Sequence, residues 1–388
     1  MRSYSWLNTT NKIVQSYDGS MPLAAWLKQF FKADKKFGSK DRKQISHLCY
    51  CYYRTGNAFQ NLDAEERILT ATFLCSTERN KVLEELMPDW NEQVSLSLVE
   101  KIDLLSAQEA IKNIFPLNDE LSNEIDVSAF GLSLLKQPDL FLRLRPGKKE
   151  KVLKQLQIAS IDFDWCSDDC VRLPNQTKLD EIIKLDKDAV VQDCNSQRVL
   201  DVLKNSKLKT LNSKLSVWDC CAASGGKSIL FYDRFPNSHL TVSDVRESIL
   251  FNLRKRFNKA GITKYGHFVA DLTLPNIPID KNFDVVICDA PCSGSGTWAR
   301  TPQQLAFFNK EKIDHYSNLQ KNIVLNAGKA IKHGGYFLYI TCSVFKKENE
   351  EVVDFIRENL PLTLVEKQYL KGYDKKADTL FVALFSQL

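Results

Sequence analysis

The second half of the chain alternates between two kinds of apolar pattern. From about Lys204 onward, short runs rich in β-branched and aromatic residues are separated by amphipathic stretches with helical spacing. The strand-like runs are LSVWDCCA, HLTVSDV, YGHFVADL, FDVVICDAP, GYFLYITCS and TLFVALFSQL. Because alternating strands and helices form parallel strands joined by crossover helices, this pattern predicts an α/β fold with a mostly parallel, doubly wound, Rossmann-like sheet.

The 388 residues are too many for one typical core, so we expect three parts. Residues 1–135 are helical in pattern, for example over Pro22–Lys32 and Ser39–Arg54. Residues 136–200 combine an alternating run, LFLRLRP, with an amphipathic stretch, which predicts a small α+β module. Residues 201–388 form the predicted Rossmann-like domain.

Composition excludes several classes of protein. With 44% hydrophobic and 26% charged residues and no low-complexity tract, the chain is neither disordered nor fibrous. No uncharged apolar run approaches the ~20 residues that cross a bilayer, so we expect a cytoplasmic protein without a membrane partner. No heptad pattern predicts a dimer seam, so a monomer is expected.

Eleven cysteines, an odd number in a large chain, do not predict a disulfide framework. Cys166 and Cys170 are the only pair spaced like metal ligands, and no second cysteine or histidine pair follows them. We therefore expect no resident metal. The net charge of +5 is compatible with a polyanionic partner but does not require one.

The first strand-like run leads into a loop of small residues, where a parallel sheet meets nucleotide-like ligands. The candidate cofactor-binding residues are Cys221, Ala222, Ala223, Ser224, Gly225, Gly226 and Lys227. As a phosphate-binding P-loop, this stretch lacks the glycine expected at Cys221. As a methyl-donor site, it needs a ribose-binding acid after the next strand and an acid near adenine, and Asp244 and Asp271 stand there. Each acid alone could cap a helix, but together they favour the donor site.

Two later strand ends carry a different set of residues. Asp289 and Cys292 follow FDVVIC, and Cys342 follows GYFLYIT. A cysteine in an apolar strand is usually a small core residue, yet these follow polar or turn-prone positions. Carbon 5 of a pyrimidine becomes nucleophilic after a thiolate adds at carbon 6, and an acid such as Asp289 can hold the ring edge. Either cysteine could be the nucleophile on this reasoning.

Several motifs together resemble the Sun/Fmu-type (RsmB-like) RNA cytosine-C5 methyltransferases. They are DCCAASGGKS, DAPCSGSGTWARTP, VVQDCNSQ and the long stretch from HYSNLQ to NEEVV, in that family's arrangement over roughly residues 138–388. The resemblance implies an S-adenosylmethionine-dependent methyltransferase core, with Cys342 as nucleophile and Cys292 aiding product release. It also implies that residues 221–227, Asp244, Asp271 and Asp289 serve the cofactor and active site, and that residues 136–200 are a small RNA-binding module. In the helical part, FGSKDRKQISHLCYCYYR is similar to a stretch that some bacterial members carry in a NusB-like RNA-binding extension.

Three positions depart from the family pattern. Ser224 replaces a proline, which removes a fixed φ angle from the cofactor loop. Ile249 replaces a common arginine, and ADTLFVALF replaces a glycine-rich stretch near the C-terminus. None of these changes affects Cys342, Cys292 or Asp289.

RNA is the expected partner, with basic residues among aromatics as candidate contacts. The positions singled out are Arg143, Arg145, Lys148 and, after the Asp289 loop, Arg300. The expected activity is methylation of carbon 5 of a cytosine, extruded from any helix, in small-subunit ribosomal RNA. The alternatives are a transfer RNA cytosine-C5 methyltransferase, a P-loop NTPase and a non-catalytic RNA-binding scaffold.

Overall fold

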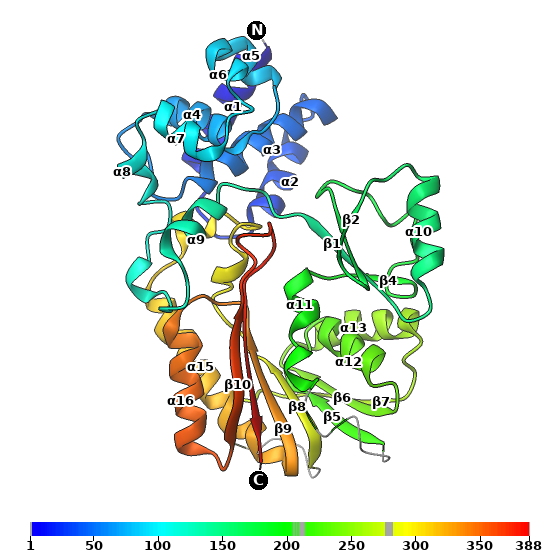
Figure 1. Cartoon of the computed structure of the whole chain (residues 1–388). Helices are drawn as coiled ribbons and strands as arrows, with labels where there is room; N and C mark the ends of the chain where they lie inside the picture. Colours follow the sequence, from blue (N-terminus) through cyan, green and yellow to red (C-terminus); the bar gives the residue numbers. More distant parts are fainter. Residues whose placement is uncertain (1, 205, 207, 209–213, 276–281, 388) are drawn as a thin grey trace. The chain divides into compact units, whose positions relative to one another are not determined.

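The computed structural model describes residues 2–204, 206, 208, 214–275 and 282–387. These residues form two compact units. The first comprises the described parts of Met1–Leu121, Ile125–Gln137 and Thr297–Lys310, and the second comprises those of Ser122–Glu124, Pro138–Gly296 and Glu311–Leu388. The predicted α+β module and the predicted Rossmann-like domain thus share one unit. Figure 1 shows the elements along the chain.

The first unit is helical, as the sequence pattern predicts. Its α-helices are α1 (Arg2–Ser16), α2 (Leu23–Ala33), α3 (Ser39–Arg54), α4 (Ala64–Cys75), α5 (Lys81–Leu86), α6 (Pro88–Glu92), α7 (Leu98–Leu104), α8 (Gln108–Ile111), α9 (Val127–Ser133) and α14 (Gln304–Phe307). Polar side chains begin several of them: Asp63 accepts from Glu66 N–H, and Ser97 accepts from Glu100 N–H. The faces of α1 to α4 that carry Trp6, Leu27 and Ile45 meet in one apolar core.

The second unit contains a small antiparallel sheet. Its strands are β1 (Leu140–Leu144), β2 (Asp164–Ser167), β3 (Cys170–Leu173) and β4 (Ala189–Val191), in the order β2-β3-β1-β4. Helix α10 (Lys149–Ile158) contributes Val152 and Leu156 to the core beneath this sheet. The α+β texture predicted from LFLRLRP and the amphipathic stretch after it is confirmed.

A seven-stranded sheet forms the rest of this unit. Its strands are β5 (Leu215–Asp219), β6 (Ser238–Asp244), β7 (Tyr265–Val269), β8 (Phe283–Asp289), β9 (Ile331–Thr341), β10 (Thr363–Leu370) and β11 (Leu380–Ser386). The order is β10-β11-β9-β8-β5-β6-β7, parallel from β7 to β9 and antiparallel at β11 and β10. The mostly parallel Rossmann-like sheet is confirmed. Strand β10 was not predicted, because its exposed positions give it no continuous apolar run.

Helices cover both faces of this sheet, as a doubly wound fold requires. In Figure 1, α12 (Gly226–Arg234) and α13 (Glu247–Ala260) lie on one side of the sheet, and α15 (Glu311–Ala327) and α16 (Glu350–Asn359) lie on the other. The short helix α11 (Cys194–Arg198) precedes β5. Chain order reverses at β5, which pairs with both β6 and β8. Such a switch point is where open α/β sheets bind ligands, at the carboxyl ends of the strands.

Candidate functional site at the switch point

The predicted cofactor loop, Cys221–Lys227, joins β5 to α12 at this switch point. Gly225 has a φ of +82°, and a Cβ there would lie 2.8 Å from the Phe257 ring, so only glycine fits without displacing α13. A Cβ on Gly226 would meet only Arg256, at 4.0 Å. The start of α12 therefore presents backbone that a ligand can approach closely.

An arginine of α13 that the sequence analysis did not single out holds this loop. Arg256 of α13 donates from Nη1 to the Ser224 carbonyl at 3.1 Å and to Ser224 Oγ at 2.9 Å. Its Nε and Nη2 bind Asp186 Oδ1 at 2.9 and 2.8 Å. The loop thus gains from Arg256 a restraint that the family's proline would otherwise supply. The basic run at residues 254–256 gave no signal that separates Arg256 from its neighbours.

The two other predicted cofactor acids lie at the ends of β6 and β7. Asp244 is buried, and its Oδ2 accepts from the Ala223 N–H at 3.0 Å, which brings it against the cofactor loop. Arg246 donates to its Oδ1. Asp271 is exposed, and hydrogen bonds from Thr273 lower the pKa of its carboxyl. The structure thus joins Asp244 to the loop, whereas Asp271 lies in its own turn.

Asp289, at the end of β8, forms an ion pair with Lys227 of the cofactor loop. The distance from Lys227 Nζ to Asp289 Oδ2 is 2.6 Å. Burial alone would lower the pKa of Lys227, but the charge of Asp289, its hydrogen bond and the proximity of Cys342 raise it instead. The ammonium group of Lys227 therefore lies beside both the acid and the predicted nucleophile.

The two predicted active-site cysteines meet although 50 residues separate them in the chain. Cys292 Sγ and Cys342 Sγ are 3.3 Å apart, and both side chains are half-buried. The hydrogen bond with Cys342, together with burial, raises the pKa of Cys292 well above its ordinary value. Cys292 is thus held as a protonated thiol next to Cys342. We call these two residues the thiol pair.

Glycine is required where the loops that carry the thiol pair cross. Gly296 N–H donates to the Cys342 carbonyl at 2.8 Å, and the Gly296 carbonyl accepts from Thr379 N–H at 2.9 Å. A Cβ on Gly296 would lie 2.0 Å from the Thr379 oxygen. The stretch that departs from the family pattern near the C-terminus therefore supports the Cys342 turn directly.

Glu348 is the main functional candidate that sequence reasoning missed. Its side chain is fully buried, and Oε2 accepts from Ser293 N–H at 2.8 Å and from Gln320 Nε2 at 3.1 Å. Oε1 accepts from Ser343 Oγ at 2.9 Å. One carboxylate thus holds the residue that follows each member of the thiol pair. The only sequence signal is an acid at the start of an otherwise amphipathic stretch.

Two of the predicted RNA contacts require correction. Arg143 is 2% exposed and pairs with Asp233 at 2.5 Å, and Arg145 pairs with the same carboxylate at 2.7 Å. They join β1 to α12 instead of facing solvent, because a buried charge needs a partner. Lys148 is half-buried, and Arg300 is half-buried within the helical unit. Those two stay predictions.

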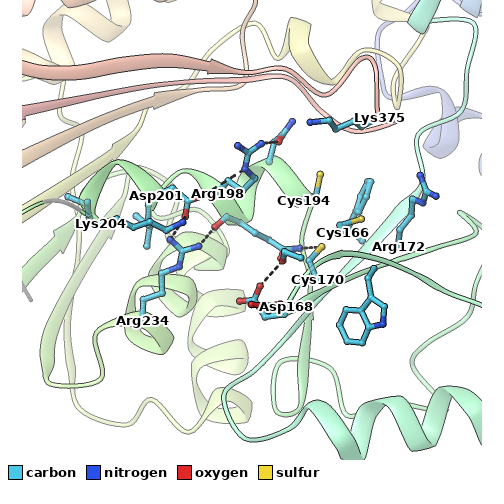
Figure 2. Close-up of a pocket in the computed structure, with 18 of the residues that line it drawn as sticks. Cys166, Asp168, Cys170, Arg172, Cys194, Arg198, Asp201, Lys204, Arg234 and Lys375 are labelled. Atoms are coloured by element: carbon cyan, nitrogen blue, oxygen red, sulfur yellow. Dashed lines mark hydrogen bonds and ion pairs between the residues drawn. The ribbon is translucent and has the colours of Figure 1, made fainter.

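A large cavity lies elsewhere in the second unit (Figure 2). Its volume is about 840 Å³, and its wall includes Cys166, Cys170, Cys194, Arg172 and Lys375. Cys166 is exposed, whereas Cys170 is buried and accepts from Gln197 Nε2 at 3.2 Å. Among the described residues, those predicted for catalysis and for the cofactor lie outside this wall. The cavity is therefore separate from the switch-point site.

Comparison with known proteins finds a similar family for the part of the chain that contains the switch point. Residues 206–379 match the family model described as 16S rRNA methyltransferase RsmB/F. This stretch, somewhat less than half of the chain, is similar to that family. The resemblance to Sun/Fmu-type enzymes is thereby confirmed.

Curated relatives agree with the family match. The Ribosomal RNA small subunit methyltransferase B of Xanthomonas campestris is 31% identical over 177 residues, which are 43% of this chain and 37% of that protein. The protein of the same name from Yersinia pseudotuberculosis is 28% identical over 178 residues, 45% of this chain and 40% of its own length. The matched region thus spans less than half of the length of these curated relatives.

Solved structures share the fold of this chain. The protein PH0851 has a TM-score of 0.69 at 18% identity, covering 97% of this chain and 96% of its own. NSun6 from Pyrococcus horikoshii, solved with SFG, has a TM-score of 0.59 at 13% identity over 70% of this chain and 97% of its own. Among the described residues, no helix combines the length and apolar character that crossing a bilayer needs.

The RsmB/F family indicates S-adenosylmethionine as the cofactor, and the residues at the switch point fit it. Its ribose hydroxyls need a carboxylate at the end of β6, where Asp244 lies against the cofactor loop. Its charged methionine part needs close approach to backbone, which Gly226 allows at the start of α12 because a Cβ there would meet only Arg256, at 4.0 Å. Asp244 and residues 221–227 are therefore the groups that would hold it.

Proposed function

We propose that this chain methylates carbon 5 of a cytosine in RNA, with small-subunit ribosomal RNA as the substrate class. The observation that carries the proposal is the 3.3 Å separation of the two thiols beside the Lys227–Asp289 ion pair. When bound, S-adenosylmethionine supplies an electrophilic methyl group. The names of the curated RsmB/F relatives support ribosomal RNA as the target.

The residues can divide the work as follows. The thiolate of Cys342 adds to carbon 6 of the ring, which breaks the 5,6 double bond and makes carbon 5 nucleophilic. Asp289 binds the polar edge of the cytosine and supports protonation of N3, and Lys227 Nζ lies 2.6 Å from Asp289 Oδ2. After transfer, a base removes the carbon-5 proton, the double bond re-forms and the Cys342 sulfur leaves.

Two properties of the site support these roles. Because the pKa of Cys292 is raised by Cys342 and by burial, Cys292 retains its proton and can return it to the departing thiolate of Cys342. Glu348 fixes both cysteine turns, so that an incoming base meets a preset geometry. Glu348 acts here as a positioning residue.

The decisive experiment measures transfer of a labelled methyl group to bulk RNA. We expect Cys342→Ser to abolish transfer while S-adenosylmethionine still binds, since Cys342 is not in the cofactor loop. We expect Cys292→Ala to leave a covalent protein–RNA adduct that survives denaturing electrophoresis. Cys166→Ser, at an exposed position remote from the switch point, is the matched control and should retain full activity. Undiminished transfer by Cys342→Ser contradicts the assignment.

Three further measurements distinguish the proposed function from a transfer RNA methyltransferase, a P-loop NTPase and a non-catalytic RNA-binding scaffold. Bisulfite sequencing of ribosomal and transfer RNA from cells with and without the gene identifies the substrate class, and a change confined to transfer RNA would replace the ribosomal proposal. Equilibrium binding of ATP but not of S-adenosylmethionine would favour a P-loop NTPase. RNA binding without any methyl transfer would favour a scaffold.

A further inference from the structure

Three cysteines that form no covalent bond in the proposed reaction converge at the start of the cofactor loop. Cys220 and Cys221 follow β5, and Cys288 is the penultimate residue of β8. Their sulfur atoms all lie within 4.8 Å of one another. We call them the thiol triad.

Pairing of β5 with β8 produces this convergence. Asp219 lies opposite Ile287 in the parallel register, and Cys220 N–H donates to the Ile287 carbonyl at 2.9 Å. The β5 strand end is thereby fixed beside Cys288. Cys220 and Cys288 are buried, whereas Cys221 is half-buried. A small ion can therefore reach the triad from the side of Cys221.

The distances between the three sulfur atoms are close to those between the ligands of one bound metal ion. A buried cysteine usually behaves as a small apolar residue, but packing does not require three sulfurs to meet. With metal–sulfur bonds of ~2.3 Å, a tetrahedral ion keeps two sulfur ligands roughly 3.8 Å apart. The observed limit of 4.8 Å requires only small side-chain shifts to reach that spacing. Among the described residues, only this group of cysteine, histidine and acidic side chains meets that limit.

We propose that the thiol triad binds one thiophilic cation with a filled d shell, Zn²⁺ or Cu⁺. Soft thiolate ligands select these ions, and a water molecule would complete a four-coordinate shell. Each thiol that binds releases its proton to solvent as a sulfur–metal bond forms, and no electron is transferred. Ion binding at the thiol triad needs no RNA, so it can be measured whether or not the protein methylates RNA.

This proposal differs from the expectation of no resident metal. Spacing rules search for paired cysteines along the chain, but here adjacent residues on one strand end meet a third from the neighbouring strand. The bound ion would tie Cys221, the first residue of the cofactor loop, to the residue before Asp289. Ion binding should therefore change the affinity for S-adenosylmethionine.

The test uses the full chain, reduced and freed of metal, titrated with Cd²⁺ as an optical probe. We expect one ion per chain, with ultraviolet thiolate-to-cadmium absorption and release of about two to three protons. Cys288→Ser should weaken binding more than about tenfold, and Cys220→Ser should do the same. Competition by Zn²⁺ and by Cu⁺, in separate titrations, identifies which ion the site prefers.

Two controls separate the thiol triad from the other cysteines. Cys342→Ser removes one member of the thiol pair and Cys194→Ser removes a thiol of the cavity, and both should retain the stoichiometric ion. Loss of the ion in Cys342→Ser with retention in Cys288→Ser would assign it to the thiol pair and overturn the proposal.

A measurement on the unsubstituted protein removes dependence on the folding of variants. Zn²⁺ should protect Cys221 from alkylation, as read by peptide mass spectrometry, while exposed Cys166 stays reactive. Equal alkylation of Cys221 with and without the ion would also overturn the proposal.

Discussion

The cofactor loop and the thiol pair lie on the same edge of one sheet, but different forces hold them. The loops of the thiol pair are fixed by buried polar groups, with Glu348 accepting hydrogen bonds from the turns that follow both cysteines. The cofactor loop is fixed by the left-handed backbone of Gly225 and by one arginine from a neighbouring helix. A nucleophile needs a fixed position, whereas a cofactor needs close access to backbone, and each region meets its own need.

Removing Glu348 should cause the largest loss. Glu348→Ala leaves the Ser293 N–H, the Ser343 hydroxyl and the Gln320 amide without their acceptor, and each stranded group costs about 1–3 kcal/mol. We expect the free energy of unfolding to fall by roughly 5 kcal/mol in urea titrations. Glu351→Ala, at an exposed position on α16, is the control and should change stability by less than about 0.5 kcal/mol. Equal stability of the two variants would show that the network does not fix the cysteine turns.

Asp219, the last residue of β5 before the cofactor loop, should make the free energy of unfolding depend on pH. Burial raises the pKa of Asp219 to about 7, against a hydrogen bond from Ser228 that lowers it. Because the folded state binds this proton more tightly than the unfolded chain, the stabilisation is complete below about pH 4 and is lost as pH rises toward 7. The difference in unfolding free energy between the natural protein and Asp219→Asn should change by up to about 4 kcal/mol over that range. A constant difference would contradict the raised pKa.

Removing the arginine that restrains the cofactor loop should have a smaller effect than the two changes above, mainly on the affinity for S-adenosylmethionine. Arg256→Gln removes the hydrogen bonds to Ser224 and leaves Asp186 without this ion pair. We expect about tenfold weaker S-adenosylmethionine binding by calorimetry, equivalent to about 1.4 kcal/mol, and little change in the thiol pair. Lys255→Gln, on the exposed side of the same helix, is the matched control. Similar affinities in both variants would mean that the loop holds its shape without Arg256.

The smallest effect should come from Ser224 itself. Ser224→Ala removes the Oγ acceptor at 2.9 Å from Arg256 but keeps the carbonyl that accepts at 3.1 Å. We expect a loss of less than about 1 kcal/mol and at most about a threefold change in cofactor affinity. A change as large as that of Arg256→Gln would assign the whole restraint to the side chain of Ser224.

Local pattern predicted much of this molecule. The alternation of strand-like and helical segments predicted the parallel sheet, because apolar periodicity follows directly from which faces are buried. Helix α3 begins and ends where its pattern predicts, at Ser39 and Arg54. The pairing of Arg143 and Arg145 with Asp233 of α12 could not be predicted, since the alternation of LFLRLRP does not show which residue faces them.

The sequence by itself determined six of the seven strands of the large sheet, the small-residue loop after β5 and the polar residues that follow several strands. Only the tertiary structure decided which of those residues meet. Cys292 and Cys342, the thiol triad, and Glu348 with its partners are brought together by pairing and packing of segments that are distant in the chain. Periodicity reports burial along one segment, whereas contacts between segments depend on strand order and register, which the parallel crossovers set.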